Sequence, residues 1–274
     1  LTVHWKRAAF MKRWRSHLSC RLLQALLGMA ALVCLTMGQV TVAGEASAEH
    51  RPIVLITGAN RGIGLALARH FHRQGFAVIG TARKPKEALE LKAIGVEVHQ
   101  LDITDPASVD SLKSKLDGRE LDILLNNAGI GGHSTPELKD LDIERLATTF
   151  DVNALGALRV IQALMPSMKM GSRRVVASMS SRMGSIQQNT GGAIGYRASK
   201  SALNSINKSL SNEFAEQGFI FVVLHPGWVR TDMTNDRATY STEESAQALF
   251  KVITGLSKPD NGQFYDLHGK SIAW

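Results

Sequence analysis

Cysteine is almost absent from this chain of 274 residues, and the two that occur, Cys20 and Cys34, both lie near its beginning. Residues 49–274 therefore have no disulfide framework, no thiolate nucleophile and no zinc site built on cysteine. The nine histidines show no metal-ligand spacing either, so we expect no metal. Hydrophobic residues make up 44% of the chain, which excludes a wholly disordered or collagen-like protein.

Acidic residues are nearly missing from the first part of the chain. Residues 1–48 carry six basic residues and one acidic residue, Glu45, and so account for +5 of the formal net charge of +8. The remaining residues are close to neutral. The high isoelectric point is therefore no argument for nucleic-acid binding, and we expect none.

Charge of either sign is absent from residues 22–44. Basic residues precede this apolar run and Ala46-Ser47-Ala48 follow it, which is the pattern of an export signal. Because about 20 apolar residues cross a bilayer, an uncleaved anchor is the alternative, with membrane contact limited to residues 22–44. We interpret residues 1–48 as a signal peptide or anchor, which makes the protein exported or membrane-anchored. A reading frame that starts at Met37 would instead leave a cytoplasmic protein.

No linker rich in proline, glycine or serine and no internal repeat divides the rest of the chain, so residues 49–274 are expected to form one domain. Short apolar runs alternate with amphipathic stretches, which predicts an α/β fold: a Rossmann-type, doubly wound parallel sheet of about seven strands with helices on both faces. The predicted strands are 53–57, 76–81, 96–101, 123–125, 174–178, 220–224 and 263–267. The predicted helices are 63–74, 86–93, 106–117, 142–169, 196–217 and 243–256.

A glycine-rich turn, TGANRGIG at residues 57–64, joins the first predicted strand to the first helix. Glycines there permit a tight turn, let the backbone approach a pyrophosphate and leave the helix N-terminus facing the anion. The turn alone is a weak signal, but its position between strand and helix predicts a dinucleotide site. The residues expected to form this site are Gly58, Asn60, Arg61, Gly62, Ile63 and Gly64.

No acidic residue follows the second predicted strand before Glu87, although an acid there would bind the 2′-hydroxyl of NAD. Arg61 and Arg83 are instead placed to clamp a 2′-phosphate, so we expect NADP(H); the less favoured alternative is that both are ordinary surface arginines. Asp102, with its neighbour Ile103, follows the third strand and is a candidate partner of the adenine. Asp102 also suits the role of a turn or helix cap.

Tyr196 and Lys200 are spaced i, i+4 at the start of a predicted helix and share one face. A free tyrosine, with a pKa of about 10, is a poor acid near neutrality. A lysine cation about 5 Å away favours the phenolate by about 3 kcal/mol at an effective dielectric of about 20. We therefore expect the pKa of Tyr196 to fall by about two units, which suits acid–base catalysis.

Polar motifs follow three further predicted strands: NNAG at 126–129, SSRMG at 180–184 and PGWVRT at 226–231. The carboxyl ends of parallel strands meet at one edge of the sheet, where ligands bind in open α/β folds. We therefore expect these motifs to line one crevice. Asn153 lies inside the long predicted helix, where an asparagine is usually structural.

In this order, TGANRGIG, NNAG, Asn153, SSRMG, YRASK at 196–200 and PGWVRTDM at 226–233 resemble the short-chain dehydrogenase/reductase family. The resemblance covers nearly all of residues 51–274. The runs SSRMGSIQQNTGG, YRASKSALN and FYDLHGKSIAW look like those of its C-factor-like carbonyl reductase branch.

The resemblance implies an NADPH-dependent oxidoreductase that reduces aldehydes or ketones. Tyr196 would protonate the carbonyl oxygen and Ser181 would hydrogen-bond it, with Ser180 as the less favoured alternative. Lys200 would lower the pKa of the tyrosine and hold the nicotinamide ribose, while Asn153 would hold a water of a proton relay. The remaining residues implied to border the ribose and nicotinamide are Asn126, Ala128, Gly129, Pro226, Gly227, Val229 and Thr231.

Two features depart from the family pattern. Tyr196 comes 15 positions after Ser181, a longer interval than is usual in the family, and the inserted stretch 187–192 is expected to shape the pocket wall. An export signal is unusual in the family and conflicts with dependence on NADPH, a cytoplasmic reductant. The alternative function is a nucleotide-binding signalling or regulatory protein with little turnover. A homodimer or homotetramer, formed through the helices near 142–169 and 196–217, is implied by the family alone.

Overall fold

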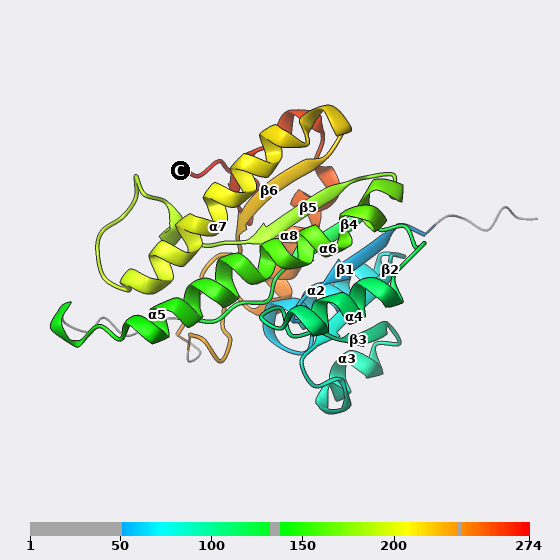
Figure 1. Cartoon of the computed structure of the whole chain (residues 1–274), viewed down its shortest axis with the longest axis horizontal. Coiled ribbons are helices and arrows are strands. Elements are labelled where there is room, and N and C mark those ends of the chain that lie inside the picture. The colour runs from blue at the N-terminus through cyan, green and yellow to red at the C-terminus, as the bar shows by residue number, and fades with distance from the viewer. Residues whose placement is uncertain (1–50, 132–137, 235–236) are drawn as a thin grey trace, which may run out of the picture. The chain divides into compact units, whose positions relative to one another are not determined.

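The computed structural model describes residues 51–131, 138–234 and 237–274 (Figure 1). Within these ranges no helix is both long and apolar enough to span a bilayer. The predicted export signal or anchor lies outside the described residues. Arg51–Trp274 forms one compact unit.

The five inner strands of the sheet are short, mostly apolar runs that are buried on both faces. In the first strand, Val54 and Ile56 point into one hydrophobic core and Leu55 points into the other. This double burial explains why the inner strands have few polar residues, as is typical of parallel sheets covered by helices, whereas the two edge strands are more polar and partly exposed. The strands are β1 (Ile53–Ile56), β2 (Ala77–Ala82), β3 (Glu97–Gln100), β4 (Ile123–Asn126), β5 (Val175–Met179), β6 (Ile220–His225) and β7 (Gln263–Asp266).

All seven strands lie in one sheet of order β3-β2-β1-β4-β5-β6-β7, and every neighbouring pair is parallel. The predicted fold class is therefore confirmed. The order reverses between β1 and β4, which pair from Val54 with Ile123 to Ile56 with Leu125. The carboxyl ends of strands at such a reversal are where this class of sheet opens a crevice for ligands.

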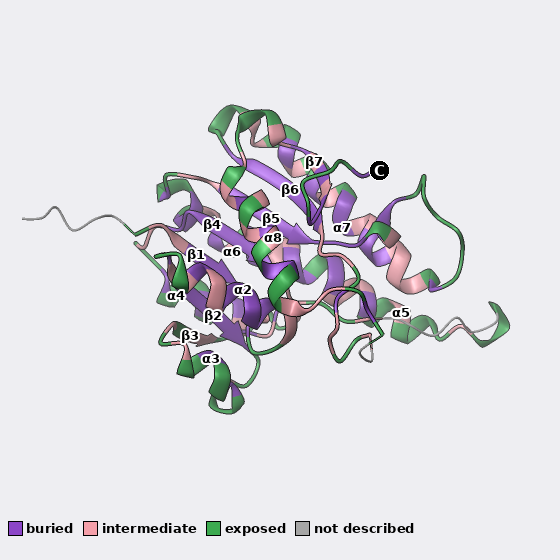
Figure 2. Cartoon of the chain, turned by 180° about the vertical axis from the view of Figure 1, so that it is seen from behind, coloured by how far each residue is buried: buried purple, intermediate pink, exposed green. Residues whose placement is uncertain are grey.

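Helices cover both faces of the sheet (Figures 1 and 2). The core under α2 (Gly62–Arg73) and α8 (Thr242–Gly255) contains Phe71 and Leu249, whereas the core under α4 (Pro106–Lys115) and α6 (Gly156–Met170) contains Leu112 and Leu164. The remaining α-helices of the described residues are α3 (Leu89–Ala93), α5 (Ile143–Phe150) and α7 (Ile194–Glu213).

Two predicted helices differ from the observed ones. The predicted helix 86–93 divides into a 3-10 turn, Pro85–Glu87, and the five-residue α3, because Ala88 between them has a non-helical ψ of 57°. The long helix predicted over 142–169 comprises α5 and α6, joined by a π-helical turn at Asp151–Leu155. Such π turns occur often at functional sites, and this one contains Asn153.

The turn after β1 is fastened to the end of β4 through one buried hydroxyl. Thr57 Oγ1 accepts hydrogen bonds from the backbone N–H groups of Asn127 and Ala128, each at 3.0 Å. In the opposite direction, the Asn127 side chain donates from Nδ2 to the carbonyls of Thr57 at 3.0 Å and Gly58 at 3.1 Å. These bonds hold together the loop after β1 and the loop after β4, which lie where the strand order reverses.

We therefore expect Thr57→Val to destabilise the protein by about 3 kcal/mol, since it preserves shape but leaves two backbone N–H groups without an acceptor. Urea denaturation followed by circular dichroism measures this change. The matched control is Thr148→Val on the exposed face of α5, where the hydroxyl bonds only the Glu144 carbonyl and the loss should stay near ~0.5 kcal/mol. Equal losses in the two variants would contradict the assignment.

Candidate active site

The glycine turn is shaped by two positions that admit no side chain. Gly58 has a φ of +63°, in the left-handed region, and a Cβ there would stand 3.0 Å from the Cα of Ala128. A Cβ on Gly64 would collide with the Gly58 carbonyl and with Nδ2 of Asn127. The chain can make this turn against the loop after β4 only with glycine at both places.

The N-terminus of α2 offers free backbone N–H groups to an anion. Arg61, at the N-cap, makes no capping bond with its side chain, and no acidic residue lies in the first turn. A helix start with uncapped N–H groups and no nearby carboxylate on the helix suits a phosphate. The predicted residues Asn60 and Arg61 are exposed at this turn, whereas Ile63 packs partly buried against the core.

The glycine turn faces the segment that follows β6. Arg61 Nη1 lies 2.7 Å from Oδ2 of Asp232, and both side chains are exposed. A Cβ on Gly62 would lie 3.5 Å from Cγ2 of Thr231. Arg61 and Asp232 are 171 positions apart in the sequence, so two distant motifs meet, as predicted, at the carboxyl edge of the sheet.

The residues after β2 and β3 also lie at the carboxyl edge of the sheet. Asp102 Oδ1 accepts from the backbone N–H of Thr104 at 3.0 Å and from its hydroxyl at 2.7 Å, so Asp102 does form the turn cap that the sequence allowed. Hydrogen bonds from Thr104 lower the pKa of Asp102, and the nearby charge of Arg83, itself exposed, lowers it further. The side chain of Ile103 is buried against Gly156, so only its backbone is available to a ligand.

The phenol of Tyr196, in the first turns of α7, hydrogen-bonds to the hydroxyl of Ser181. Ser181 follows β5, and its Oγ also accepts from the Met183 N–H at 3.2 Å, which caps the 3-10 turn η4 (Arg182–Gly184). Ser180 is engaged elsewhere, because its hydroxyl donates to Oδ1 of Asn204 at 2.6 Å. The geometry therefore favours Ser181 over Ser180 as the partner of the tyrosine.

Lys200 lies one turn further along α7 and is only 5% exposed. Its Nζ donates to the Met179 carbonyl at 2.8 Å and stands 5.8 Å from the centre of the Tyr196 ring. Burial lowers the pKa of Lys200 to about 8. The ammonium is therefore beside the phenol, as expected, but it is held by a backbone carbonyl.

The predicted fall in the pKa of Tyr196 is not what this site shows. Burial raises the pKa of Tyr196 above 10, and the hydrogen bond with Ser181 opposes that rise without cancelling it. The attraction of the lysine cation alone would lower the pKa of Tyr196. Burying a phenolate has a cost that acts in the opposite direction, and the same burial disfavours the charged form of Lys200.

Asn153 joins the loop after β4 to α7 from its place in the π turn. Its Oδ1 accepts from the Ile130 N–H at 2.8 Å, and its Nδ2 donates to the Ile130 carbonyl at 3.0 Å and to Oγ of Ser199 at 3.1 Å. Ser199 in turn donates to the carbonyl of Tyr196 at 2.9 Å. Asn153 thus links the loop after β4, through Ser199, to the turn of α7 that carries the phenol.

The three residues predicted from the NNAG motif have different environments. Gly129 is exposed, and a Cβ there would lie 3.1 Å from Oδ1 of Asn153 and 3.6 Å from Nζ of Lys200. Any side chain larger than that of glycine would therefore obstruct the approach of a ligand to Nζ of Lys200. Ala128 is half-buried against Gly58. Asn126 is buried in β4, and its side-chain amide has no hydrogen-bond partner among the described residues.

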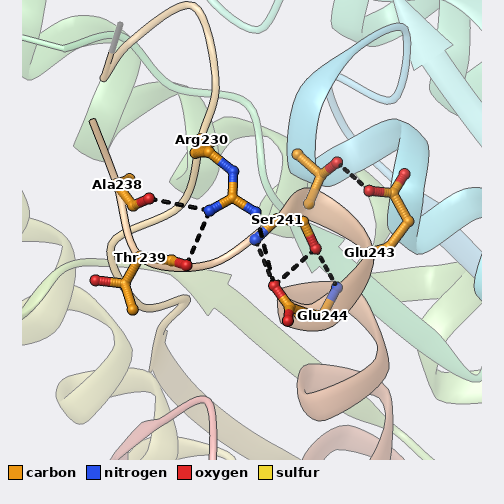
Figure 3. Close-up of polar contacts among 7 residues, drawn as sticks. Arg230, Ala238, Thr239, Ser241, Glu243 and Glu244 are labelled. Atoms are coloured by element: carbon orange, nitrogen blue, oxygen red, sulfur yellow. Dashed lines mark hydrogen bonds and ion pairs between the residues drawn. The ribbon is translucent and has the colours of Figure 1, made fainter. Parts of the chain in front are cut away.

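The segment after β6, described over residues 226–234 and 237–241, folds back on itself and is called the lid below (Figure 3). Val229 forms an isolated parallel bridge with Tyr240, and the Tyr240 ring packs on Gly227, where a Cβ would lie 2.9 Å away. Arg230 holds the lid together by donating Nη1 to two carbonyls, at 3.1 Å and 2.9 Å. The carbonyl of Pro226 accepts from Ser245 at 2.7 Å, which fixes the start of the lid to α8.

Residues 52–241 match the family described as short chain dehydrogenase. The chain belongs to the short-chain dehydrogenase/reductase family. It is 44% identical to the C-signal of Myxococcus xanthus over 155 residues, which are 56% of this chain and 93% of that protein.

Solved structures of carbonyl reductases have the same fold as this short-chain dehydrogenase/reductase. Carbonyl reductase Sniffer of D. melanogaster is 32% identical, with a TM-score of 0.78 over 82% of this chain and all of that one. The NADPH-bound carbonyl reductase from chicken fatty liver is 34% identical, with a TM-score of 0.76 over 82% of this chain and 96% of that one. The predicted family and its carbonyl reductase-like branch are thus confirmed.

Three positioning residues of this short-chain dehydrogenase/reductase were missed by the sequence analysis: Thr57, Asn127 and Ser199. Thr57 and Asn127 use short polar side chains to bond backbone groups of a neighbouring segment, whereas Ser199 donates to the Tyr196 carbonyl of its own helix and accepts from Nδ2 of Asn153. Thr57 and Asn127 stand directly at strand ends, where such side chains compete for turn backbone, and this placement was the available signal. No such signal marks Ser199.

The site predicts that Tyr196 ionises at a higher pH than a free tyrosine when no ligand is bound, because burial raises the pKa of its phenol. Ultraviolet titration of tyrosinate, taken as the difference between wild type and Tyr196→Phe, measures this directly. The other two tyrosines, Tyr240 and Tyr265, are present in both proteins and cancel in the difference. A phenolate that forms near pH 8 in this difference would show that attraction by the Lys200 cation, and not burial, decides the pKa of Tyr196.

Proposed function

We propose that this protein is an NADPH-dependent reductase of aldehydes or ketones. The observation that carries the proposal is the hydrogen bond between Tyr196 and Ser181 at the carboxyl edge of the sheet, beside buried Lys200. Binding of a dinucleotide alone does not need a phenol paired with a hydroxyl. The likeness to carbonyl reductases supports the same reaction.

Bound NADPH supplies a hydride to the carbonyl carbon, and the residues of the chain handle the proton. The raised pKa of Tyr196 keeps the phenol protonated, so that it can donate its proton to the carbonyl oxygen. Ser181 is placed to hydrogen-bond the same oxygen and to stabilise the charge that develops there. Lys200, with Gly129 leaving the approach to its Nζ open, is placed to bind a ribose hydroxyl and to favour the phenolate left after proton transfer.

Positive charge near the proposed nucleotide site favours NADPH over NADH. Arg61 in the glycine turn and Arg83 after β2 are both exposed, and no acid that could bind a ribose 2′-hydroxyl follows β2 before Glu87. Two guanidinium groups bind a 2′-phosphate through charge-assisted hydrogen bonds. The Asp232 carboxylate, which now pairs with Arg61, is largely accessible to solvent and can release it at little cost.

A second function is favoured by the similarity to the C-signal of Myxococcus xanthus. In that alternative the protein binds the nucleotide and acts as a signal or regulator with little turnover. A wild-type protein that binds NADPH but reduces no aldehyde or ketone would support the alternative over the reductase.

With the full chain and a panel of aldehydes and ketones, we expect Tyr196→Phe to lower kcat/KM about 1,000-fold, since it removes the proton donor. Ser181→Ala should lower it about 100-fold. The matched control is Ser180→Ala, whose hydroxyl bonds Asn204 and which should stay within about threefold of wild type once folding is verified. NADPH oxidation followed by absorbance gives the rates, and a fluorescence titration checks that NADPH still binds. Equal losses for the two serine variants would contradict the assignment of Ser181 as the partner of the carbonyl oxygen.

Replacement of Arg61 or Arg83 by alanine should weaken NADPH binding by about 10- to 100-fold, because each removes a charge-assisted contact to the 2′-phosphate. Binding of NADH, which lacks that phosphate, should change little. Arg73→Ala, in the exposed last turn of α2, is the matched control. Equal weakening of NADH and NADPH binding would show that the two arginines do not recognise the 2′-phosphate.

A further inference from the structure

The loop between Ser181 and Tyr196 has little support from the sheet or its helices. Residues 186–192 are all exposed, and Figure 2 shows the loop standing off α7. Its far end is fixed by Arg197, which donates Nε to the carbonyls of Gly191 at 3.0 Å and Gly192 at 3.1 Å. The end of the loop nearer to Ser181 is held by the last described residues of the chain.

The chain after β7 reverses and runs back beside that strand. Asp266 N–H donates to the Lys270 carbonyl at 2.9 Å, and Ser271 bridges Tyr265 in the antiparallel sense. Ile272 is buried, and its N–H donates to the Phe264 carbonyl at 2.8 Å. These contacts give residues 271–274, the tail, a defined path along the sheet.

The tail ends against the near end of the loop. The carbonyl oxygen of Trp274 accepts hydrogen bonds from the Gln187 N–H at 3.0 Å and from the Ser185 hydroxyl at 3.2 Å. Ser185 Oγ accepts in turn from the Gln188 N–H at 3.1 Å. The Trp274 ring lies 5.6 Å from the ring of Phe264 in β7. In both views the end of the chain marked C lies close to α7, the helix that the loop leads into.

We propose that Trp274 is a positioning residue that sets the conformation of loop 185–193 and thereby the affinity for the carbonyl substrate. This inference rests on the proposed function. The loop joins the two residues that hydrogen-bond at the site, so it borders any substrate placed on them. A loop fixed at both ends loses less conformational entropy when substrate binds than a loop fixed at one end. Trp274 should therefore act on KM rather than on the chemical step.

The test uses the full chain and three variants. Trp274→Ala removes the ring that seats the tail on Phe264, Trp274→Phe keeps an aromatic ring there, and Lys270→Ala changes an exposed side chain of the same reversal as a control. For Trp274→Ala we expect a KM for a bulky aromatic ketone raised about fivefold, a kcat within about twofold of wild type and an unchanged Kd for NADPH. Trp274→Phe should restore most of the affinity, and Lys270→Ala should match wild type.

Hydrogen exchange provides a readout that does not depend on turnover. The amides of Gln187 and Gln188 should exchange faster in Trp274→Ala and in Ser185→Ala, while peptides from α6 keep their protection. If no variant changes exchange in residues 185–193, or if kcat falls as much as KM rises, the positioning role is wrong. If the wild type reduces no carbonyl compound, the proposed function fails, and the exchange measurement alone decides whether the tail fixes the loop.

Discussion

The phenol of Tyr196 reaches the hydroxyl of Ser181 because the turn after β5 packs against α7 with no side chain between them. A Cβ on Gly184 would lie 2.9 Å from the backbone of Lys200, so the close approach requires glycine. The Gly184 carbonyl then accepts from Ser201 at 2.9 Å and from Asn204 at 3.2 Å, both on α7. Everything proposed about the chemistry depends on this contact, since it brings a strand end and a helix start to one point.

Burial gives the site its electrostatic character. It raises the pKa of Tyr196 and lowers that of Lys200 to about 8, so each group is biased toward its neutral form. A neutral phenol is the form that donates a proton, which fits the direction of carbonyl reduction. The lysine ammonium, held by the Met179 carbonyl, has to exchange that partner for one on a bound ligand before it can favour the phenolate.

Most of the sheet could be predicted from the sequence because its inner strands are short and mostly apolar and alternate with helices along the chain. The motifs at the carboxyl edge could be placed for the same reason, since each follows a strand. The contacts that hold the motifs together could not be predicted: Thr57 with the NNAG loop, Asn153 with Ser199, and Trp274 with Ser185 join residues that are 46 to 89 positions apart. The pKa of Tyr196 was predicted in the wrong direction, because spacing along a helix reports the neighbouring charge but not the depth of burial.

The central claim is the proposal that this chain transfers a hydride from NADPH to the carbon of a carbonyl group whose oxygen Tyr196 and Ser181 hydrogen-bond. The most direct measurement incubates the full chain with a ketone and NADPH deuterated at the reactive C4 of the nicotinamide, and analyses the product by mass spectrometry and NMR. The account predicts an alcohol with one deuterium on the former carbonyl carbon. Tightly bound NADPH with no labelled alcohol from any aldehyde or ketone would contradict it.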